Sequence, residues 1–187
     1  MEKRFTKAIS KSPIKIVITG PESTGKSTLA EQLADHYKTA FIPEYARSYI
    51  EKLGRTYVYE DIEHIAKHQV QDIELYKPLA NHILFLDTFL IITKVWFSVV
   101  YKKHPEWLDQ SIKESDIDLF LLCNTDLPWK PDLVRENGGE MREHLFRMYQ
   151  QELEHYGFNY RIVTGFGESR LANAITFIDE YLNRIID

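Results

Sequence analysis

Short, continuous apolar runs alternate along the chain with stretches in which apolar residues recur every three or four positions. The continuous runs are typical of strands covered on both faces, and the periodic stretches are typical of amphipathic helices. Strands that alternate with helices predict an α/β fold, in which a five-stranded parallel sheet carries helices on both faces. The expected strands are Ile14–Thr19, Ile83–Asp87, Leu119–Cys123, residues 160–164 and a shorter run over residues 39–43 that ends at a proline.

Helical spacing predicts the elements between these strands. We expect amphipathic helices over residues 29–37, 58–73, 141–156 and 171–185. Residues 88–101 are apolar nearly all round, which predicts a helix in the middle of the core. The segment that follows the fourth strand is rich in Pro, Gly and Asn and is long for a loop, so we expect a lid over about residues 124–142.

The composition is that of one globular domain. The chain has 187 residues, of which 44% are hydrophobic, enough for a single core over residues 1–187. Its net charge of −5 gives no electrostatic footprint for nucleic acid or for anionic membranes. Asp87 and Lys94 interrupt the one membrane-like run, which is also too short to span a bilayer. We therefore expect a cytoplasmic protein without nucleic-acid or membrane partners, and the sequence leaves its oligomeric state open, a homo-oligomer included.

The strongest chemical signal is the stretch GPESTGKS, which matches the phosphate-binding pattern G-x-x-x-x-G-K-[ST] in full. It follows a predicted strand and opens a predicted helix, which is the context that the pattern requires. Backbone N–H groups of such a loop point at phosphate oxygens, and the helix N-terminus adds partial positive charge. Lys26 would reach the β- and γ-phosphates of ATP, and the Ser27 hydroxyl would bind Mg²⁺. The expected nucleotide-binding residues are Gly20, Pro21, Glu22, Ser23, Thr24, Gly25, Lys26, Ser27 and Thr28.

A second metal ligand is expected at Asp87. P-loop enzymes place a carboxylate near Mg²⁺ at the end of a neighbouring strand, and Asp87 closes the apolar run Ile83–Asp87. The alternative is that Asp87 caps the following helix, with help from Thr88. A charge beside a buried strand end is costly unless it is paired, which favours the metal role. We therefore assign Mg²⁺ to Ser27 and Asp87, and catalysis to Lys26 and Asp87.

An acceptor site is expected where the weakest strand ends, because strand ends at this edge of an open α/β sheet line the ligand crevice. Glu44 could hold or deprotonate a substrate hydroxyl, and Arg47 could steady a phosphate. The alternative for this pair is a surface ion pair near a helix start. Tyr45, Tyr57 and Phe89 are the aromatic residues of the expected acceptor site.

Two more residues are assigned to the nucleotide side. Arg135 lies in the expected lid and could close over the phosphates to offset charge in the transition state, the alternative being a solvated loop arginine. Phe166 lies between two glycines after the last strand and could wrap the adenine. The alternative for Phe166 is an ordinary strand-to-helix turn.

Together these motifs resemble those of the ribosylnicotinamide kinase domain of bacterial NadR-type proteins. The resemblance implies a P-loop nucleoside-kinase fold, use of ATP and Mg²⁺, and phosphorylation of the 5′-hydroxyl of nicotinamide riboside. The chain departs from the family pattern in having Phe89 where the family has a second Asp, and Pro43 where it has an aromatic residue. The stretches that carry the resemblance are GPESTGKS at 20–27, EYAR at 44–47, HQ at 68–69, LDT at 86–88, HPEWLD at 104–109 and DLPWKPDLVR at 126–135.

Other functions would use the same nucleotide site. A kinase for a different nucleoside or small metabolite shares every motif of the ATP side. A switch GTPase would need N-K-x-D after the fourth strand, and the stretch from Asn124 to Asp126 lacks the Lys. A non-catalytic nucleotide sensor would not need the intact set of Lys26, Ser27 and Asp87.

Overall fold

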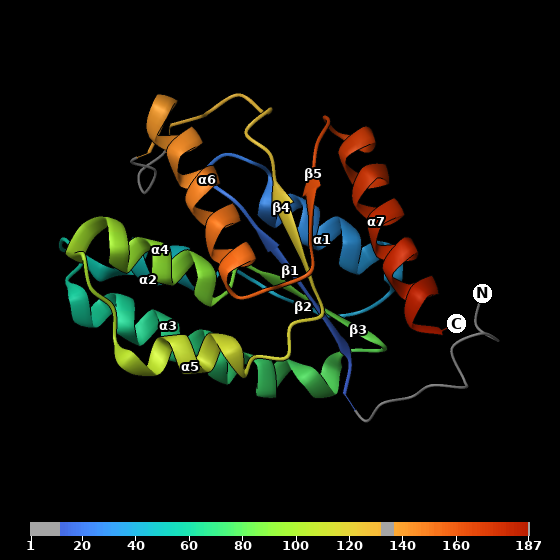
Figure 1. The fold of residues 1–187 in the computed structure, drawn as a ribbon, viewed down its shortest axis with the longest axis horizontal. Helices are drawn as coiled ribbons and strands as arrows, with labels where there is room; N and C mark the ends of the chain where they lie inside the picture. Colours follow the sequence, from blue (N-terminus) through green and yellow to red (C-terminus); the bar gives the residue numbers. More distant parts are fainter. Residues whose placement is uncertain (1–11, 132–136, 187) are drawn as a thin grey trace.

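Five parallel strands form the centre of the structure, a computed structural model that describes residues 12–131 and 137–186 (Figure 1). Within these residues the strand order is β2-β3-β1-β4-β5, and every neighbouring pair is parallel. The predicted parallel sheet is therefore confirmed, although the run predicted over 39–43 shortens to two residues. The strands are β1 (Ile14–Thr19), β2 (Phe41–Ile42), β3 (Ile83–Asp87), β4 (Leu119–Cys123) and β5 (Tyr160–Val163).

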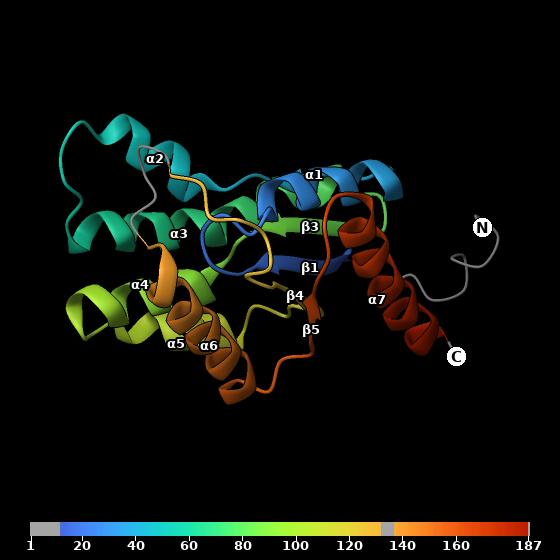
Figure 2. The same ribbon diagram turned by 90° about the horizontal axis from the view of Figure 1, so that it is seen from above.

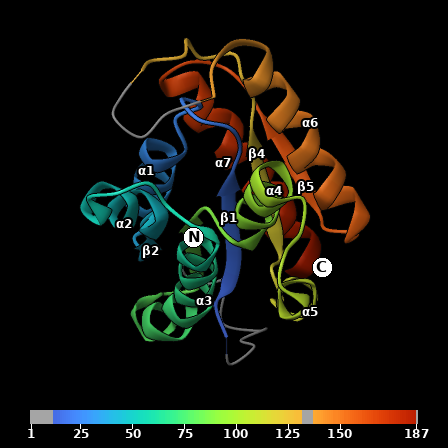
Figure 3. The ribbon, with the colours of Figure 1, turned by 90° about the vertical axis from the view of Figure 1, so that its left-hand side faces the viewer.

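Helices cover both faces of this sheet (Figures 2 and 3). One face carries α1 and α7, and the other carries α3, α4, α5 and α6. Within the described residues, no helix is both long and apolar enough to span a bilayer. The helices are α1 (Lys26–Tyr37), α2 (Tyr45–Leu53), α3 (Tyr59–Tyr76), the short 3₁₀ helix η2 (Lys77–Leu79), α4 (Leu90–Tyr101), α5 (Glu106–Lys113), α6 (Gly139–His155) and α7 (Glu168–Ile186).

The strands are apolar at consecutive positions because each side of the sheet has its own core layer. In β1, Ile16 and Ile18 enter the layer under α1 and α7, while Val17 enters the layer under α3 to α6. In β3, Phe85 and its neighbours divide in the same way, and all of these side chains are fully buried. Burying such a side chain stabilises the fold by about 1.5–3 kcal/mol relative to leaving it in water.

The strand register brings the candidate site together. Ile18 of β1 lies opposite Asp87 of β3, and Ile42 of β2 lies opposite Leu86. Because all five strands are parallel, the residues that follow them meet at one edge of the sheet. The phosphate-binding loop, Glu44 and Asp87 therefore leave the sheet side by side.

Helix α2 was not predicted, and the reason is that it buries none of its residues. It is held to α3 by aromatic and polar contacts instead. The ring of Tyr45 stacks on His68 with centroids 3.5 Å apart, and its hydroxyl lies 3.0 Å from Nε2 of His64. Farther along, the Tyr49 hydroxyl donates to Asp61. His68, which the sequence pattern could only place on a helix face, therefore packs against the helix that follows β2.

A buried lysine joins three helices behind the site. Lys94 on α4 is 7% exposed, and its ammonium group lies 2.9 Å from a carboxylate oxygen of Asp109 on α5 and 3.0 Å from one of Glu152 on α6. It also donates to the Tyr156 hydroxyl, which in turn donates to Asp109. Burial alone would lower the pKa of Lys94, but these three partners raise it above its ordinary value. His104 hydrogen-bonds Asp109 as well, so the HPEWLD stretch serves this network.

Replacing this lysine is expected to destabilise the protein. Lys94→Met leaves the Asp109 and Glu152 carboxylates without their buried cation, and we expect the free energy of unfolding to fall by about 2–4 kcal/mol. We expect a loss near the low end of this range, because Asp109 is 39% exposed and remains partly solvated. Urea unfolding followed by circular dichroism measures the loss. Lys113→Met, on the exposed side of α5, should change stability by less than about 0.5 kcal/mol, and a similar loss in both variants would contradict the network's role.

Candidate functional site

The phosphate-binding loop opens into a cavity of about 920 Å³ at the carboxyl edge of the sheet. Of the residues predicted for a site, Lys26, Ser27, Glu44, Arg47 and Tyr57 all line it. The structure thus brings the predicted nucleotide side and part of the predicted acceptor side into one space. The other walls come from the α2–α3 connection (Gly54, Arg55, Thr56), from α4 (Ile92, Trp96, Val99, Val100), and from Asn137, Leu145 and Tyr149.

The loop is curved so tightly that its first glycine has no substitute. Gly20 has φ of 138°, and a Cβ atom built there would lie 2.8 Å from the carbonyl oxygen of Cys123 in β4. The carbonyl of Pro21 accepts hydrogen bonds from the Thr24 hydroxyl at 2.8 Å and from the Lys26 ammonium at 2.9 Å. The loop leads into α1, whose first turn has no acidic side chain and no side-chain cap. The partial positive charge of that helix end is therefore available to an anion.

Asp87 is buried beside the loop without a hydrogen-bond partner. It is 2% exposed, and neither carboxylate oxygen has a partner with hydrogen-bond geometry. Burial raises the pKa of Asp87, while the nearby Lys26 and Ser27 act in the opposite direction. The capping alternative is wrong, because α4 begins after Phe89 and no side chain caps it. An orphaned buried carboxylate is costly unless a ligand compensates it.

The donor set around Asp87 fits Mg²⁺. Among the described residues, no group of three or more His, Cys, Asp or Glu side chains could hold a metal ion by itself. Mg²⁺ in phosphate-transfer sites is typically bound by one or two protein oxygens, with phosphates and waters completing its octahedron. Ser27 and Asp87 supply that number of oxygens, so the predicted metal ligands stay a prediction whose chemistry the site can satisfy.

Glu44 and Arg47 do not form the surface ion pair that was their alternative role. Glu44 precedes α2 and lines the cavity, whereas the Arg47 guanidinium pairs with Glu51 on the next turn at 3.0 Å. Across the cavity, Tyr149 is buried on α6. Its burial raises the pKa of its hydroxyl, and the negative charges of Glu22 and Glu44 raise that pKa further. Glu22 and Glu44 therefore both lie close enough to Tyr149 to influence its hydroxyl electrostatically.

Two aromatic residues form one wall of the cavity, and only one of them was predicted to line a site. Tyr57 was assigned to the acceptor site, but Trp96 lies within residues 88–101, which were predicted to form a helix in the middle of the core. The two rings meet edge to face with centroids 4.9 Å apart, and both line the cavity. The signal that would have found Trp96 is its spacing with Ile92 and Val99, which marks one face of α4.

Two predicted acceptor residues do not reach this cavity. The ring of Tyr45 is stacked on α3, as described above. Phe89 is 3% exposed and contributes to a second cavity of about 500 Å³, together with the start of β1 and the end of α3. The reason is the intervening Thr88, whose φ of 71° breaks the strand alternation that would have put Phe89 beside Asp87. The backbone at Thr88 is a strained conformation for a β-branched residue.

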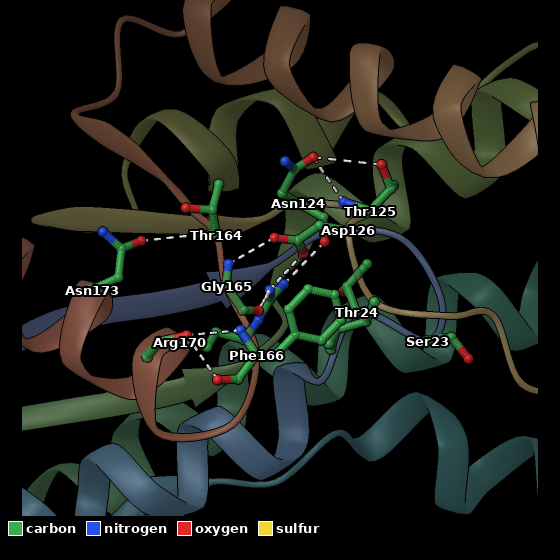
Figure 4. Close-up of polar contacts among 12 residues, drawn as sticks. Ser23, Thr24, Asn124, Thr125, Asp126, Thr164, Gly165, Phe166, Arg170 and Asn173 are labelled. Carbon is green, nitrogen blue, oxygen red and sulfur yellow. Dashed lines mark hydrogen bonds and ion pairs between the residues drawn. The ribbon is translucent and has the colours of Figure 1, made fainter.

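The turn between β5 and α7 is organised by a buried arginine that the sequence did not single out (Figure 4). Arg170 is 4% exposed and donates to the Asp126 carboxylate at 2.7 Å and to the backbone carbonyls of Gly165 and Asn124. The second oxygen of Asp126 accepts from the Gly165 N–H at 2.7 Å. The Asp126 carboxylate thus holds the turn between β5 and α7 in place. Phe166, at the tip of this turn, is 59% exposed.

The predicted lid is described only at its two ends. Arg135 and residues 132–136 lie outside the described residues, so the catalytic role of Arg135 stays a prediction. The described ends contact the phosphate-binding loop. The Ser23 hydroxyl and the backbone of Lys130 exchange hydrogen bonds at 3.0 and 3.2 Å, and Asn137 donates twice to the Glu22 carboxylate. The Glu22 side chain, predicted to bind nucleotide, is therefore turned toward Asn137.

Comparison with known proteins identifies a family and related sequences for this chain. A family model described as an AAA domain matches residues 15–170. The "Trifunctional NAD biosynthesis/regulator protein NadR" of Escherichia coli (strain K12) is 31% identical over 130 residues, which are 67% of this chain and 32% of that protein. The chain thus spans about a third of the length of the curated relatives it matches.

Solved structures share the fold. A NadR protein in complex with NR superposes with a TM-score of 0.74 at 24% identity, covering 90% of this chain and 49% of that chain. Deoxyadenosine kinase from M. mycoides superposes with a TM-score of 0.62 at 15% identity, covering 89% of this chain and 100% of that chain. The predicted P-loop fold, of the kind seen in nucleoside kinases, is therefore confirmed.

The unpaired Asp87 leads to a prediction about stability. Asp87→Asn should raise the melting temperature of the ligand-free protein at pH 7, because the ionised carboxylate is buried at a cost that the neutral amide avoids. A carboxyl pKa that is raised by folding lowers stability as the pH rises through it, so the gain should shrink in acid. The same substitution should remove the effect of Mg²⁺ on nucleotide affinity. Differential scanning calorimetry and titration calorimetry with and without Mg²⁺ measure the two effects.

Asp61→Asn is the matched control for that experiment. Asp61 is also buried, but Arg55, Tyr49 and the Val58 N–H all donate to it, and the Arg55 hydrogen bond above all holds its pKa below the usual range. This substitution should lower the melting temperature at pH 7, and the difference should fade below about pH 4, where the unfolded carboxyl is protonated. Equal destabilisation in both variants would show that the Asp87 charge is not unpaired.

Proposed function

Because the chain belongs to the AAA domain family and carries an intact phosphate-binding loop, we propose that it is an ATP-dependent kinase for the 5′-hydroxyl of a nucleoside, with nicotinamide riboside as the preferred acceptor. One observation carries the proposal. The phosphate loop and an acceptor wall with Glu44 and aromatic rings line one cavity large enough for two small molecules, and Asp87 is buried at the end of the strand beside that loop. A site that served a nucleotide alone would not need the second wall.

On the ATP side, residues of the chain would orient the phosphates and offset their negative charge. The loop N–H groups and the start of α1 would bind the phosphates, and Lys26 would leave the Pro21 carbonyl to reach the β- and γ-phosphates. Ser27 and Asp87 would hold Mg²⁺, and the chemistry that the ion supplies when bound is neutralisation of charge on those phosphates. Arg135, by its place in the sequence, would add a further positive charge as the lid closes.

On the acceptor side, Glu44 is the proposed base. Its carboxylate would take the proton of the 5′-hydroxyl as that oxygen bonds to the γ-phosphorus and the bond to the ADP oxygen breaks. The products are the nucleoside monophosphate and ADP. Glu44 must do this without the second Asp of the family pattern, since Phe89 is turned into the core.

The charges of the acceptor wall favour a nucleoside over a nucleoside monophosphate. Arg47 is paired with Glu51, and Arg55 makes two hydrogen bonds to Asp61. Each arginine thus has a carboxylate against it, while Glu44 adds a negative charge to the same wall. An acceptor that already carried a phosphate would have to compete with these carboxylates for the two arginines, whereas a cationic nicotinamide ring would be attracted by the carboxylates.

The aromatic wall fits the same acceptor. Tyr57 and Trp96 present ring surfaces to the cavity beside the apolar side chains of α4. A flat cationic ring gains both stacking and cation–π attraction on such a surface. The names of the curated relatives, which refer to NAD biosynthesis, and the solved NadR protein in complex with NR support this choice of acceptor.

The ATP assignment makes the next prediction. Lys26→Ala should weaken ATP binding by about 10–100-fold, because a charge-assisted hydrogen bond to phosphate contributes about 1.5–3 kcal/mol. Titration calorimetry with ATP and Mg²⁺ measures the change. Lys38→Ala, at the far end of α1, is the control and should bind ATP like the wild type. Equal affinity in Lys26→Ala and the wild type would show that Lys26 does not contribute to ATP binding.

The acceptor assignment is tested by steady-state kinetics on a nucleoside panel. Nicotinamide riboside should be the best acceptor, and Glu44→Gln should lower kcat by about 10²–10⁴-fold, the usual contribution of a general base. Glu51→Gln, on the helix that follows Glu44, should lower kcat less than tenfold. If another nucleoside were phosphorylated and nicotinamide riboside were not, the chain would be a kinase for a different acceptor. If ATP bound and no acceptor were phosphorylated, it would be a nucleotide sensor.

A further inference from the structure

The guanidinium of Arg142 clamps the phosphate-binding loop from outside the cavity. Arg142 lies in the first turn of α6 and is 6% exposed. Its Nε donates to the carbonyl of Glu22 at 3.0 Å and its Nη2 to the carbonyl of Ser23 at 2.9 Å, while its Nη1 donates to the carbonyl of Leu127 at 2.8 Å. One side chain thus joins the loop to the segment that follows β4.

These contacts decide which way two peptide groups of the loop face. A trans peptide is planar, and its N–H points opposite to its C=O. Because the carbonyls of Glu22 and Ser23 point to Arg142, the N–H groups of Ser23 and Thr24 point away from it. Both of these residues line the cavity. The preceding carbonyl, of Pro21, is held by the Thr24 hydroxyl, so three successive carbonyls of the loop have fixed donors.

Arg142 stands where a helix does not favour a cation. The amino end of a helix carries partial positive charge, and a basic side chain in the first turn is unfavourable there. The guanidinium is also buried, which costs free energy that its hydrogen bonds must offset. A residue kept against a local preference is typical of a functional position.

We propose that Arg142 is a positioning residue for phosphate binding, which holds the loop so that the N–H groups of Ser23 and Thr24 face the phosphates of the bound nucleotide. It does not touch the nucleotide. The fork of the guanidinium is needed, since one side chain must reach two adjacent carbonyls at a fixed angle, which a lysine ammonium cannot do with the same geometry. The role rests on the proposed binding of ATP by this loop.

The test compares Arg142→Met and Arg142→Lys with the wild type, and Arg147→Met, an exposed arginine on the same helix, is the control. Titration calorimetry with ATP and Mg²⁺ is run well below the melting temperature of each variant. We expect Arg142→Met to bind ATP about 10–100-fold more weakly, as when two hydrogen bonds to phosphate are lost. Arg142→Lys should recover only part of this affinity, and the control should match the wild type. In turnover assays the KM for ATP should rise while the KM for the acceptor stays within about threefold.

The outcomes separate this role from its alternatives. A folded Arg142→Met that binds ATP like the wild type, with only its melting temperature lowered, would overturn the proposal and leave a structural arginine. Full recovery by Arg142→Lys would also overturn it, because charge alone would then be sufficient. Should Arg142→Met not fold, Arg142→Lys decides by itself, with weakened ATP binding in support and wild-type binding against. Failure of the wild type to bind ATP would instead refute the proposed function, and the positioning role with it.

Discussion

Parallel pairing of β1 with β3 on one side and β4 on the other is the constraint on which the rest of this structure depends. It fixes the register in which Ile18 faces Asp87 and Thr19 faces Leu122. The loop that follows β1 is then bounded by a carboxylate on one side and by the backbone of β4 on the other. The close approach of Gly20 to the Cys123 carbonyl exists only because these two strands end together. A phosphate site at this edge is a direct result of strand direction.

At this edge of the sheet the core requires apolar side chains, whereas the candidate site requires a charged one. The layers under and over the sheet are apolar and closely packed, yet Asp87 is placed among them with no hydrogen-bond partner of good geometry. Lys94, in contrast, is buried with two carboxylates and a hydroxyl around it. A paired charge maintains the arrangement of helices, whereas an unpaired one is destabilising until a ligand compensates it. Burial thus has opposite consequences for the stability of these two charges, according to whether hydrogen-bond partners surround them.

The strands and the phosphate loop could be predicted because their signals are local. A strand covered on both faces must be apolar at every position, and the loop needs its glycines, lysine and serine at fixed spacing. Phe89 was misplaced because the left-handed backbone at Thr88 has no signal in a residue type that rarely adopts it. Arg142 and Arg170 were missed for a different reason. Their partners are largely backbone carbonyls, which every residue has, so no sequence pattern marks them.

Helix α2 has a consequence for how the acceptor wall behaves in solution. The helix carries Arg47 and Ile50 into the cavity, yet it buries no residue of its own and is held mainly by rings and hydrogen bonds on α3. Segments with little buried apolar surface open at a much lower free energy than the global unfolding of the protein. We therefore expect the amide protons of α2 to exchange with solvent before those of α3 and α4. The cavity is thus bounded on one side by a helix of the core, α4, and on the other by a helix that is held at the surface of α3.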